Sequence, residues 1–193
     1  MGTGRGSTHG SCCGDCVNVP CAGQNAPPSR GAPVNEKETI GRVLQHIPYG
    51  LYVVGSLNGP VPATMVANWV TQVSFTPPWV AIAVEADSRM REYITRSGVF
   101  SVNILPSGAR EMAKAFLKGP EAKGGAVGGK KFETAENGTP FLVDASASFE
   151  CRVMRTVDVP DHALFLGEVV DAVIRREGAG VLTLRETGWR YNR

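Results

Sequence analysis

The sequence predicts a mainly β fold, a mostly antiparallel barrel with a few peripheral helices. Six short runs after residue 48 are rich in Val, Ile, Phe and Leu and are bounded by Gly, Pro, Asp or Ser, as strands usually are. The last three runs are joined by turns alone, at Pro160-Asp161 and Glu177-Gly178, so they should pair antiparallel. Only three segments have helical spacing of their apolar residues.

The composition is that of one ordinary globular domain with or without a tail. The chain has 193 residues, 42% hydrophobic and 20% charged, so it can bury a core without a metal or a disulfide. A net charge of +2 argues against a dedicated nucleic-acid binder. No apolar run is long enough to span a bilayer, and the first ten residues contain no secretory signal. We therefore expect a soluble, cytoplasmic protein that binds neither nucleic acid nor membrane.

Residues 1–34 are expected to form a flexible tail, and residues 35–193 a single domain. The tail is rich in Gly and Pro and has almost no large apolar side chains, so it cannot offset the entropy of ordering. It also carries four candidate metal ligands with one CxxC spacing: Cys12, Cys13, Cys16 and Cys21. Zinc or an iron–sulfur cluster is one interpretation. A thiol-bearing tail without metal is the other, because adjacent cysteines seldom serve one tetrahedral ion.

The predicted elements follow in order. An amphipathic helix over residues 35–47 has apolar residues at i, i+3, i+4 and i+7, is capped by Asn35 and is ended by Pro48. Strands are expected over residues 50–56, 79–85, 99–105, 147–157, 163–174 and 181–185. Short helices are expected over residues 88–95 and 107–117.

The segment KGPEAKGGAVGGKKFE, residues 118–133, resembles a phosphate-binding loop only superficially. That motif needs Ser or Thr after its lysine and a strand before its first glycine, and here Lys131 follows and a predicted helix precedes. We interpret the segment as a flexible surface loop, suited to covering a bound ligand.

Residues 63–78, ATMVANWVTQVSFTPP, would have two different faces as an extended strand. The side chains on the apolar face, which suits a core, are Ala63, Met65, Ala67, Trp69, Val73 and Phe75. The polar face, whose uncharged side chains can hydrogen-bond to a heterocycle and a phosphate, carries Thr64, Asn68, Gln72, Ser74 and Thr76. A solvated edge strand is the other interpretation. The length of the segment indicates a bend or a helical turn within residues 67–73.

Several strings occur together in the order found in one known family. They are ANWVTQVSFTPPWVAIAVE, SRMREYITRSGVFSVNIL, FETAENGTPFLVDASASFECRV and DHALFLGEVVDA. Over residues 36–191 the chain resembles the flavin reductase-like family with the FMN-binding split-barrel fold, and especially the C-terminal reductase domain of cyanobacterial flavodiiron proteins. The resemblance implies a six-stranded antiparallel Greek-key split barrel, in agreement with the six strands expected from the pattern.

The resemblance also implies cofactors and partners. Members of the family are homodimers that bind FMN, sometimes FAD, near the subunit interface and take hydride from NADH or NADPH. They pass electrons to free flavin, a monooxygenase or another acceptor. The chain is therefore expected to be an NAD(P)H:flavin oxidoreductase. An FMN-binding electron-transfer module without nicotinamide turnover is the alternative, and a ligand-free interaction scaffold is a third possibility.

Matched position by position, the flavin-contacting stretch of the family falls within residues 63–78. The matching residues are Thr64, Asn68, Thr71, Gln72, Ser74 and Phe75. An isoalloxazine needs mixed donors and acceptors at its edge and apolar walls on its faces. Ser88 and Arg89 match the next element, where a hydroxyl, a guanidinium and a helix N-terminus suit a phosphate. A plain N-cap serine beside a solvated arginine is the other interpretation.

His162 is the candidate catalytic residue. In the family the histidine of this motif lies at the open face of the flavin and is associated with nicotinamide binding. We expect it to position the nicotinamide, because hydride transfer needs the two reacting atoms held together rather than an acid or a base. Without the resemblance, a lone histidine at the start of a strand is a turn or surface residue. Trp189 and Tyr191 either stack on the ligand or close the end of the barrel.

Overall fold

The computed structural model of the chain describes residues 36–119 and 121–189. The predicted tail and its four candidate ligands, Cys12, Cys13, Cys16 and Cys21, lie outside the described residues. The chain divides between Thr39 and Ile40 into two units. The first helix, α1 (Glu36–Leu44), crosses this boundary and is shorter than the predicted 35–47. All other elements belong to the second unit.

The strands of the described residues form two sheets. In spatial order, the larger sheet contains β2 (Val61–Ala67), β1 (Tyr52–Asn58), β5 (Val99–Ile104), β10 (Ala147–Asp158), β11 (His162–Ile174), β4 (Pro78–Glu85) and β3 (Val70–Phe75). The smaller sheet contains β6 (Ala122–Lys123), β7 (Ala126–Val127), β8 (Lys130–Thr134) and β9 (Pro140–Leu142). Every neighbouring pair is antiparallel. The mainly β, antiparallel fold class is confirmed, with seven strands in the large sheet where six were expected.

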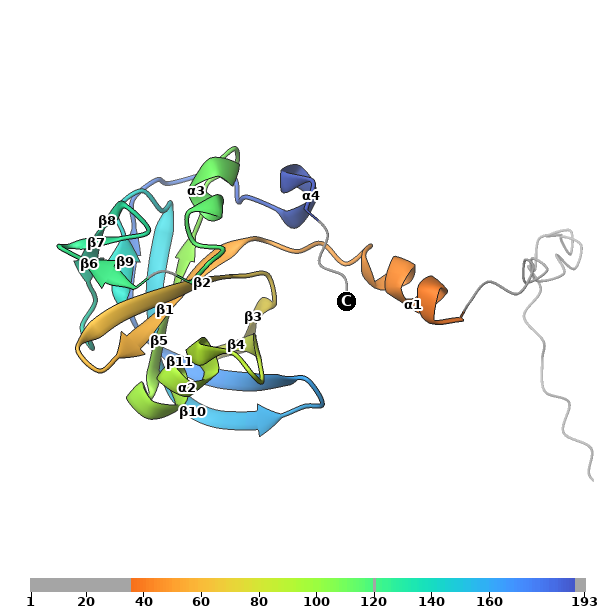
Figure 1. Cartoon of the computed structure of the whole chain (residues 1–193), viewed down its shortest axis with the longest axis horizontal. Coiled ribbons are helices and arrows are strands. Elements are labelled where there is room, and N and C mark those ends of the chain that lie inside the picture. The colour runs from red at the N-terminus through yellow and green to blue at the C-terminus, as the bar shows by residue number, and fades with distance from the viewer. Residues whose placement is uncertain (1–35, 120, 190–193) are drawn as a thin grey trace, which may run out of the picture. The chain divides into compact units, whose positions relative to one another are not determined.

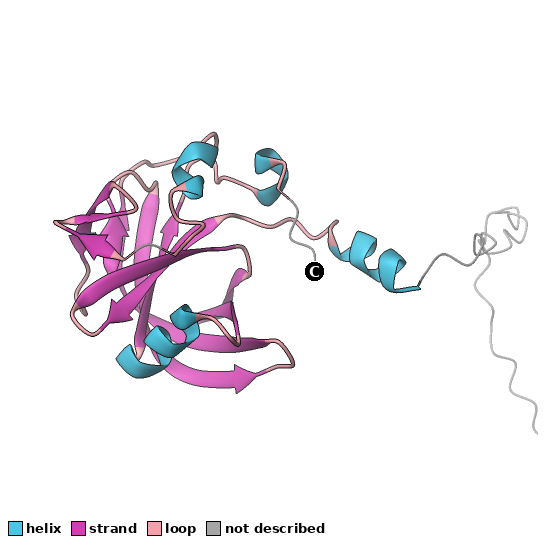
Figure 2. Cartoon of the chain, in the orientation of Figure 1, coloured by secondary structure: helices cyan, strands magenta, loops and turns pink. Residues whose placement is uncertain are grey.

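The strand order requires the large sheet to curl. Its edge strands β2 and β3 follow each other in the chain and are separated only by Asn68 and Trp69. Neighbouring strands lie roughly 4.8 Å apart, so the two edges of a flat sheet of this size would be roughly 29 Å apart. The chain from the end of β2 to the start of β3 spans at most about 11 Å. The sheet therefore rolls into an open barrel, as Figures 1 and 2 show.

The helix α2 (Arg89–Ser97) packs mainly against β1 and also contacts β2, β4 and β5. It begins because the Ser88 side chain caps it, accepting a hydrogen bond of 3.2 Å from the amide of Arg91. It ends at Gly98, whose φ of 73° is the left-handed conformation that a helix C-cap requires. The prediction of a helix here is confirmed, extended by two residues at its end.

The predictions of a helix over residues 107–117 and of a strand over residues 181–185 were wrong in part. The helix expected over residues 107–117 is limited to α3 (Arg110–Lys114). The strand expected over residues 181–185 is instead an isolated bridge at Val181 and another at Thr183, followed by α4 (Leu184–Thr187). The Thr183 hydroxyl caps this helix by accepting from the amide of Glu186, so a local capping interaction outweighs the β propensity of the segment.

The strand β1 is buried on both faces because two apolar cores meet there. Val54 belongs to the core inside the barrel, with Ile82, Phe100 and Phe165. Val53 points the other way, into a core shared with Phe116, Leu142 and Leu182. Alternate side chains of a strand point to opposite faces, so a nearly continuous apolar run is what such a position needs.

Asn103 joins the two sheets by hydrogen bonds. Its Nδ2 donates to the carbonyls of Val53 (3.0 Å) and Pro140 (3.1 Å). Its Oδ1 accepts from the amide of Leu142 (2.7 Å) and from the hydroxyl of Ser148 (2.8 Å). The amide is fully buried, and its two donors and its acceptor all have partners, so it stabilises the seam between β1, β5, β10 and β9.

The segment 118–133, predicted to be a flexible loop, is largely folded. Gly124-Gly125 and Gly128-Gly129 form the two-residue turns of two successive hairpins, β6–β7 and β7–β8. All four glycines have positive φ, between 56° and 78°, as the tightest hairpin turns require. Val127 is fully buried in the second core and anchors this ribbon. The rejection of a phosphate-binding loop is in keeping with this geometry, since no helix follows Gly129-Lys130.

Candidate functional site

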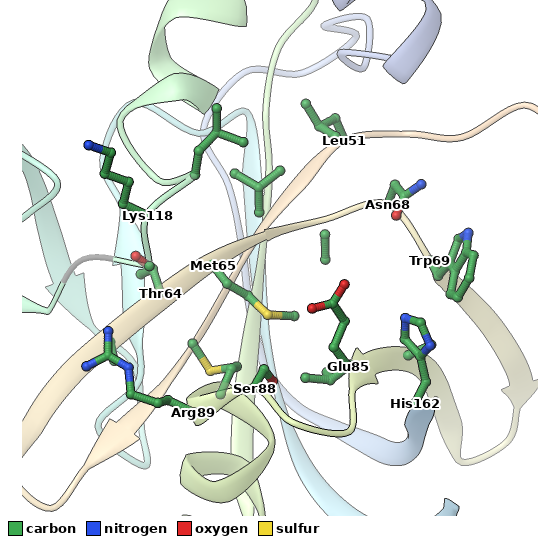
Figure 3. A pocket seen from close by; sticks show the side chains of 18 of the residues that line it. Leu51, Thr64, Met65, Asn68, Trp69, Glu85, Ser88, Arg89, Lys118 and His162 are labelled. Carbon is green, nitrogen blue, oxygen red and sulfur yellow. The ribbon is translucent and has the colours of Figure 1, made fainter. Parts of the chain in front are cut away.

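A pocket of about 590 Å³ opens inside the barrel between β2, the end of β4 and the start of α2. Figure 3 shows Thr64, Arg89 and Lys118 at one end of it and Trp69 and His162 at the other. The walls between these ends include the apolar side chains of Leu51, Met65, Val66, Ala83, Val84 and Met90. The volume and the mixture of apolar walls with a few polar groups are typical of a small-molecule site.

Five of the predicted site residues line this pocket although they come from three separate segments. They are Thr64 and Asn68 from β2 and its end, Ser88 and Arg89 from the start of α2, and His162 from the start of β11. β11 pairs with β4 so that His162 lies opposite Glu85. The curl of the sheet therefore brings together polar residues that are almost a hundred positions apart in the sequence.

Asn68, which lines the pocket, has an unused donor. Its side chain lies in the bend between β2 and β3 and is only 9% exposed. Its Nδ2 is buried and has no hydrogen-bond partner among the described residues. A buried amide donor left without a partner costs roughly 1–3 kcal/mol. Such a group is stabilised when a ligand supplies an acceptor, so Asn68 marks the pocket as a binding site.

His162 is held in a defined orientation at the mouth of the pocket. Its Nδ1 lies 2.8 Å from Oδ1 of Asp161, and its ring packs against Trp69 with centroids 4.7 Å apart. The turn before it is closed by the amide of Val159, which donates to the carbonyl of His162 (2.9 Å). In the tautomer with its proton on Nδ1, the ring donates to this carboxylate and Nε2 is an acceptor. The side chain is 6% exposed, so it belongs to the site rather than to the surface.

The N-terminus of α2 supplies the positive end of the pocket. Ser88 and Arg89 both line it, and the backbone amides of a first helical turn favour an anion. Oγ of Ser88 already accepts from the amide of Arg91, so the N-cap interpretation is correct for this atom. The Arg89 side chain is largely exposed and its Nη1 lies 3.8 Å from Oε1 of Glu121, a loose ion pair that leaves its other donors for a ligand.

Residues 44–190 match the family described as the flavin reductase like domain. The chain belongs to this flavin reductase-like family. The resemblance found in the sequence is confirmed.

Two curated relatives are similar to this domain. Diflavin flavoprotein A 1 of Synechocystis sp. is 34% identical over 157 residues, which make up 80% of this chain and 27% of that protein. The NADH-dependent FAD reductase of Streptomyces globisporus is 33% identical over 153 residues, 76% of this chain and 81% of that protein. The chain therefore spans about a quarter of the length of the diflavin relative.

Solved structures show the same fold. The Streptomyces globisporus C-1027 NADH:FAD oxidoreductase SgcE6, in complex with NAD and FAD fragments, has a TM-score of 0.67 to this domain at 28% identity. The match covers 82% of this chain and 92% of that one. The flavin reductase PheA2 has a TM-score of 0.63 at 27% identity, covering 76% and 92% of the two chains.

The pocket of this flavin reductase-like domain fits a flavin by its chemistry. The orphaned amide of Asn68 can donate to a carbonyl or phosphate oxygen, and the hydroxyl of Thr64 lies on the same wall. Met65, Trp69 and Val84 offer the apolar walls that a flat ring needs. Arg89 and Lys118 supply positive charge at one end for a phosphate.

The other four predicted flavin contacts do not line this pocket. Thr71, Gln72, Ser74 and Phe75 lie on β3, an edge strand of the sheet. Oγ1 of Thr71 donates to the carbonyl of Gln72, and Nε2 of Gln72 donates to the carbonyl of Ser74. Their contact with flavin stays a prediction.

The expected apolar face of residues 63–78 was wrong for β3. Phe75 is 87% exposed and Val73 is 50% exposed, whereas Thr64 on the expected polar face is buried. The register of β3 against β4 shifts between Gln72 and Ser74, and among the described residues the strand pairs on one side only. Val70 still packs against the core inside the barrel, whereas Val73 and Phe75 are left exposed.

Sequence reasoning missed Glu85, and assigned Met65 and Trp69 to the core although they line the pocket. Figure 3 shows the Glu85 carboxylate pointing into the middle of the pocket, between Met65 and His162. The available signal was a charged residue at the end of an otherwise apolar strand, WVAIAVE. Trp189 lines the pocket and also packs against the second core, so its two interpretations both stay open, and Tyr191 lies outside the described residues.

Two absences hold for residues 36–119 and 121–189. No helix there has the length and apolar character needed to cross a bilayer. No group of three or more His, Cys, Asp and Glu side chains is arranged there to hold a metal ion. The metal interpretation of Cys12, Cys13, Cys16 and Cys21 stays a prediction.

Proposed function

We propose that the chain is a flavin reductase that oxidises NADH or NADPH and reduces a flavin, FMN or FAD. The observation that carries the proposal is the unpartnered amide of Asn68, buried in a pocket that also holds His162 and the start of α2. The similarity to an NADH-dependent FAD reductase supports the same activity. When bound, the flavin supplies a two-electron acceptor, which amino-acid side chains lack.

The residues that line the pocket have different roles in binding the flavin. Asn68 and Thr64 orient the ligand by hydrogen bonds, and Met65 and Trp69 exclude water from its faces. Ser88, Arg89 and the first amides of α2 hold the phosphate. Donors that contact the edge of the flavin also stabilise the negative charge that develops on reduction.

His162 positions the nicotinamide in this proposal. With Asp161 fixing the proton on Nδ1, Nε2 can accept a hydrogen bond from a carboxamide N–H group at the mouth of the pocket. Holding the dinucleotide in reacting geometry can lower the barrier substantially without any proton transfer by the ring. Asp161 acts only through His162, as a positioning residue.

We further propose that the chain forms a homodimer through β3. The supporting observations are an unpaired sheet edge and an exposed Phe75, which a partner copy would cover. This arrangement would also bring Thr71, Gln72 and Ser74 to a flavin near the interface. Sedimentation analysis should give a dimer for the wild-type chain and a monomer for Phe75→Ser; a wild-type monomer would remove this part.

Anaerobic mixing with NADH, and separately NADPH, tests the function. The chain with one equivalent of FMN or FAD should lose its visible flavin absorbance much faster than flavin and nicotinamide do without protein. His162→Ala should slow this loss and raise KM for the nicotinamide while leaving flavin affinity nearly unchanged. Tight flavin binding without any bleaching would favour the electron-transfer module instead. No binding of either flavin would refute the proposal altogether.

The reduced flavin or its electrons then go to an acceptor, either free flavin, a monooxygenase component or another redox protein. The proposal keeps the cytoplasmic location expected from the sequence, and it keeps zinc or an iron–sulfur cluster at Cys12, Cys13, Cys16 and Cys21 as a prediction to be tested. Iron and zinc analysis of the purified chain tests the metal, with Cys13→Ser and Cys16→Ser as the variants that should lose it.

A further inference from the structure

A second cavity adjoins the flavin pocket at its positive end. It has a volume of about 560 Å³ and shares Arg89, Lys118 and Gly119 with the first pocket. Its other lining residues are Glu121 and Lys123, together with the small residues Ala126, Gly128 and Gly129 of the β6–β7–β8 ribbon. The two cavities therefore meet where the phosphate of a flavin is expected.

The charges of the second cavity match a second phosphate. Arg89, Lys118 and Lys123 are three cations against the single carboxylate of Glu121, which leaves a net charge of +2. Oε1 of Glu121 is occupied by other contacts, because it accepts from the hydroxyl of Tyr93 (3.0 Å) and from Nδ2 of Asn58 (3.4 Å). These bonds hold the carboxylate in place. A pyrophosphate, with one negative charge on each phosphate, complements this set.

The walls of the cavity are fixed by the fold. Gly119 lies so close to β2 that a Cβ on it would be 3.2 Å from the carbonyl oxygen of Thr64. The turn at Gly128 approaches α3 equally closely, since a Cβ there would lie 3.0 Å from the carbonyl oxygen of Ala115. An isolated bridge between Ala63 and Glu121 ties the start of the ribbon to β2. The lysines are therefore carried by anchored backbone.

We infer that the second cavity binds the AMP half of FAD, so that this site selects FAD over FMN; this rests on the proposed flavin site. Arg89 and Lys118, shared by both cavities, would contact the pyrophosphate where the two cavities meet. Lys123 would contact its phosphate nearer the adenosine, and the small residues would leave room for the adenine. NADH also carries an adenosine diphosphate group. FAD is the better occupant because the cavity opens from the end of the pocket that is distant from His162, where the nicotinamide is expected (Figure 3).

Calorimetric titration of the full chain with FMN and with FAD tests the inference. Wild-type protein should bind FAD more tightly than FMN. Lys123→Ala should weaken the binding of FAD about fivefold to tenfold and change the affinity for FMN less than about twofold. The reason is that one charge-assisted contact is lost only for the dinucleotide. Arg89→Ala should weaken the binding of both flavins. The matched control is Lys131→Ala, an exposed lysine on β8 outside both cavities, which should change neither affinity.

Each other outcome is decisive. If Lys123→Ala lost equal affinity for FMN and FAD, or lost no affinity for FAD, the assignment of the second cavity would be overturned. The proposed flavin site would remain in place. A raised KM for NADH with unchanged FAD affinity would assign the cavity to the nicotinamide dinucleotide and overturn the inference as stated. If the wild-type chain bound neither flavin, the proposed function itself would fall. Circular dichroism of each variant checks that the ribbon remains folded.

Discussion

Two buried asparagines, Asn103 and Asn68, show how the barrel seam and the pocket differ. The Asn103 amide uses both of its donor protons and its acceptor in hydrogen bonds to other elements of the chain. The Asn68 amide, 9% exposed, has a donor nitrogen without a partner among the described residues. The same residue type therefore stabilises the fold in one region and is left for a ligand in the other.

The contrast extends to charged residues. Glu150 on β10 is fully buried and accepts hydrogen bonds from the backbone and side chains of Asn137 and Thr139. It thereby fixes the turn before β9. At the pocket, Arg89 is mostly exposed and forms a loose ion pair with Glu121. Saturated polar groups indicate structure, and polar groups with spare capacity in a cavity indicate binding.

Asn103→Ala should have the largest effect on stability. It removes four hydrogen bonds and leaves four buried partner groups, and each unsatisfied group costs about 1–3 kcal/mol, although such costs do not add fully. We expect the free energy of unfolding to fall by about 3–5 kcal/mol, measured by urea unfolding. A loss under about 1 kcal/mol would break the comparison, because Asn103 would then not hold the seam.

Glu150→Ala should have the next largest effect. The change leaves the buried amide of Thr139 and the partly buried amide of Asn137 without their acceptor, which should lower the free energy of unfolding by about 2–4 kcal/mol. Glu136→Ala is the matched control, because Glu136 lies in the same turn with an exposed side chain. Equal losses in the two variants would mean that the turn, and not the buried carboxylate, is sensitive.

Cys151 should make the stability of the fold depend on pH in the alkaline range. Burial, and secondly the charge of Glu150, raises the pKa of its thiol from 9.0 to about 12. Between these values the unfolded chain has lost a proton that the folded chain keeps. The contribution of the protonated thiol to the free energy of unfolding is therefore complete below pH 9.0 and is lost as the pH rises toward about 12. The stability difference between wild type and Cys151→Ala should therefore shrink above about pH 9. Urea unfolding at several pH values measures it, and a constant difference would contradict the prediction.

Asn68→Ala should have the smallest effect on the flavin-free protein. Because Nδ2 has no partner to lose within residues 36–119 and 121–189, the free energy of unfolding should change by less than about 1 kcal/mol, in either direction. The same substitution at Asn103 serves as the comparison under identical conditions. A loss at Asn68 as large as that at Asn103 would show that the pocket amide is structural too.

Five strands of the barrel could be predicted because each of them is an apolar run with clear boundaries. The predicted ends of β1, β4, β5, β10 and β11 agree with the structure within two residues. The ribbon of residues 118–133 was missed because its strands are two residues long between paired glycines, and its stability comes from burial of Val127 by distant residues. The Gly-Gly pairs were a usable hairpin signal.

The site was predicted largely through the family resemblance, since spacing alone cannot bring Asn68 and His162 together. The curl of the sheet does that, and it depends on long-range strand pairing. Glu85 was missed because its one local signal, a charged residue at the end of an apolar strand, is equally typical of a surface carboxylate. The orientation of β3 was wrong because a register shift and an uncovered sheet edge are properties of tertiary structure, not of alternation.

Flavin affinity of wild-type and Asn68→Ala protein tests the central claim most directly. Calorimetric titration with FMN should give at least about tenfold weaker binding for the variant, because a buried donor that meets its acceptor only in the complex is lost. The two proteins should unfold at nearly the same urea concentration when no flavin is present. Equal flavin affinities would contradict the account, since the buried Nδ2 of Asn68, which has no partner among the described residues, would then have no part in binding.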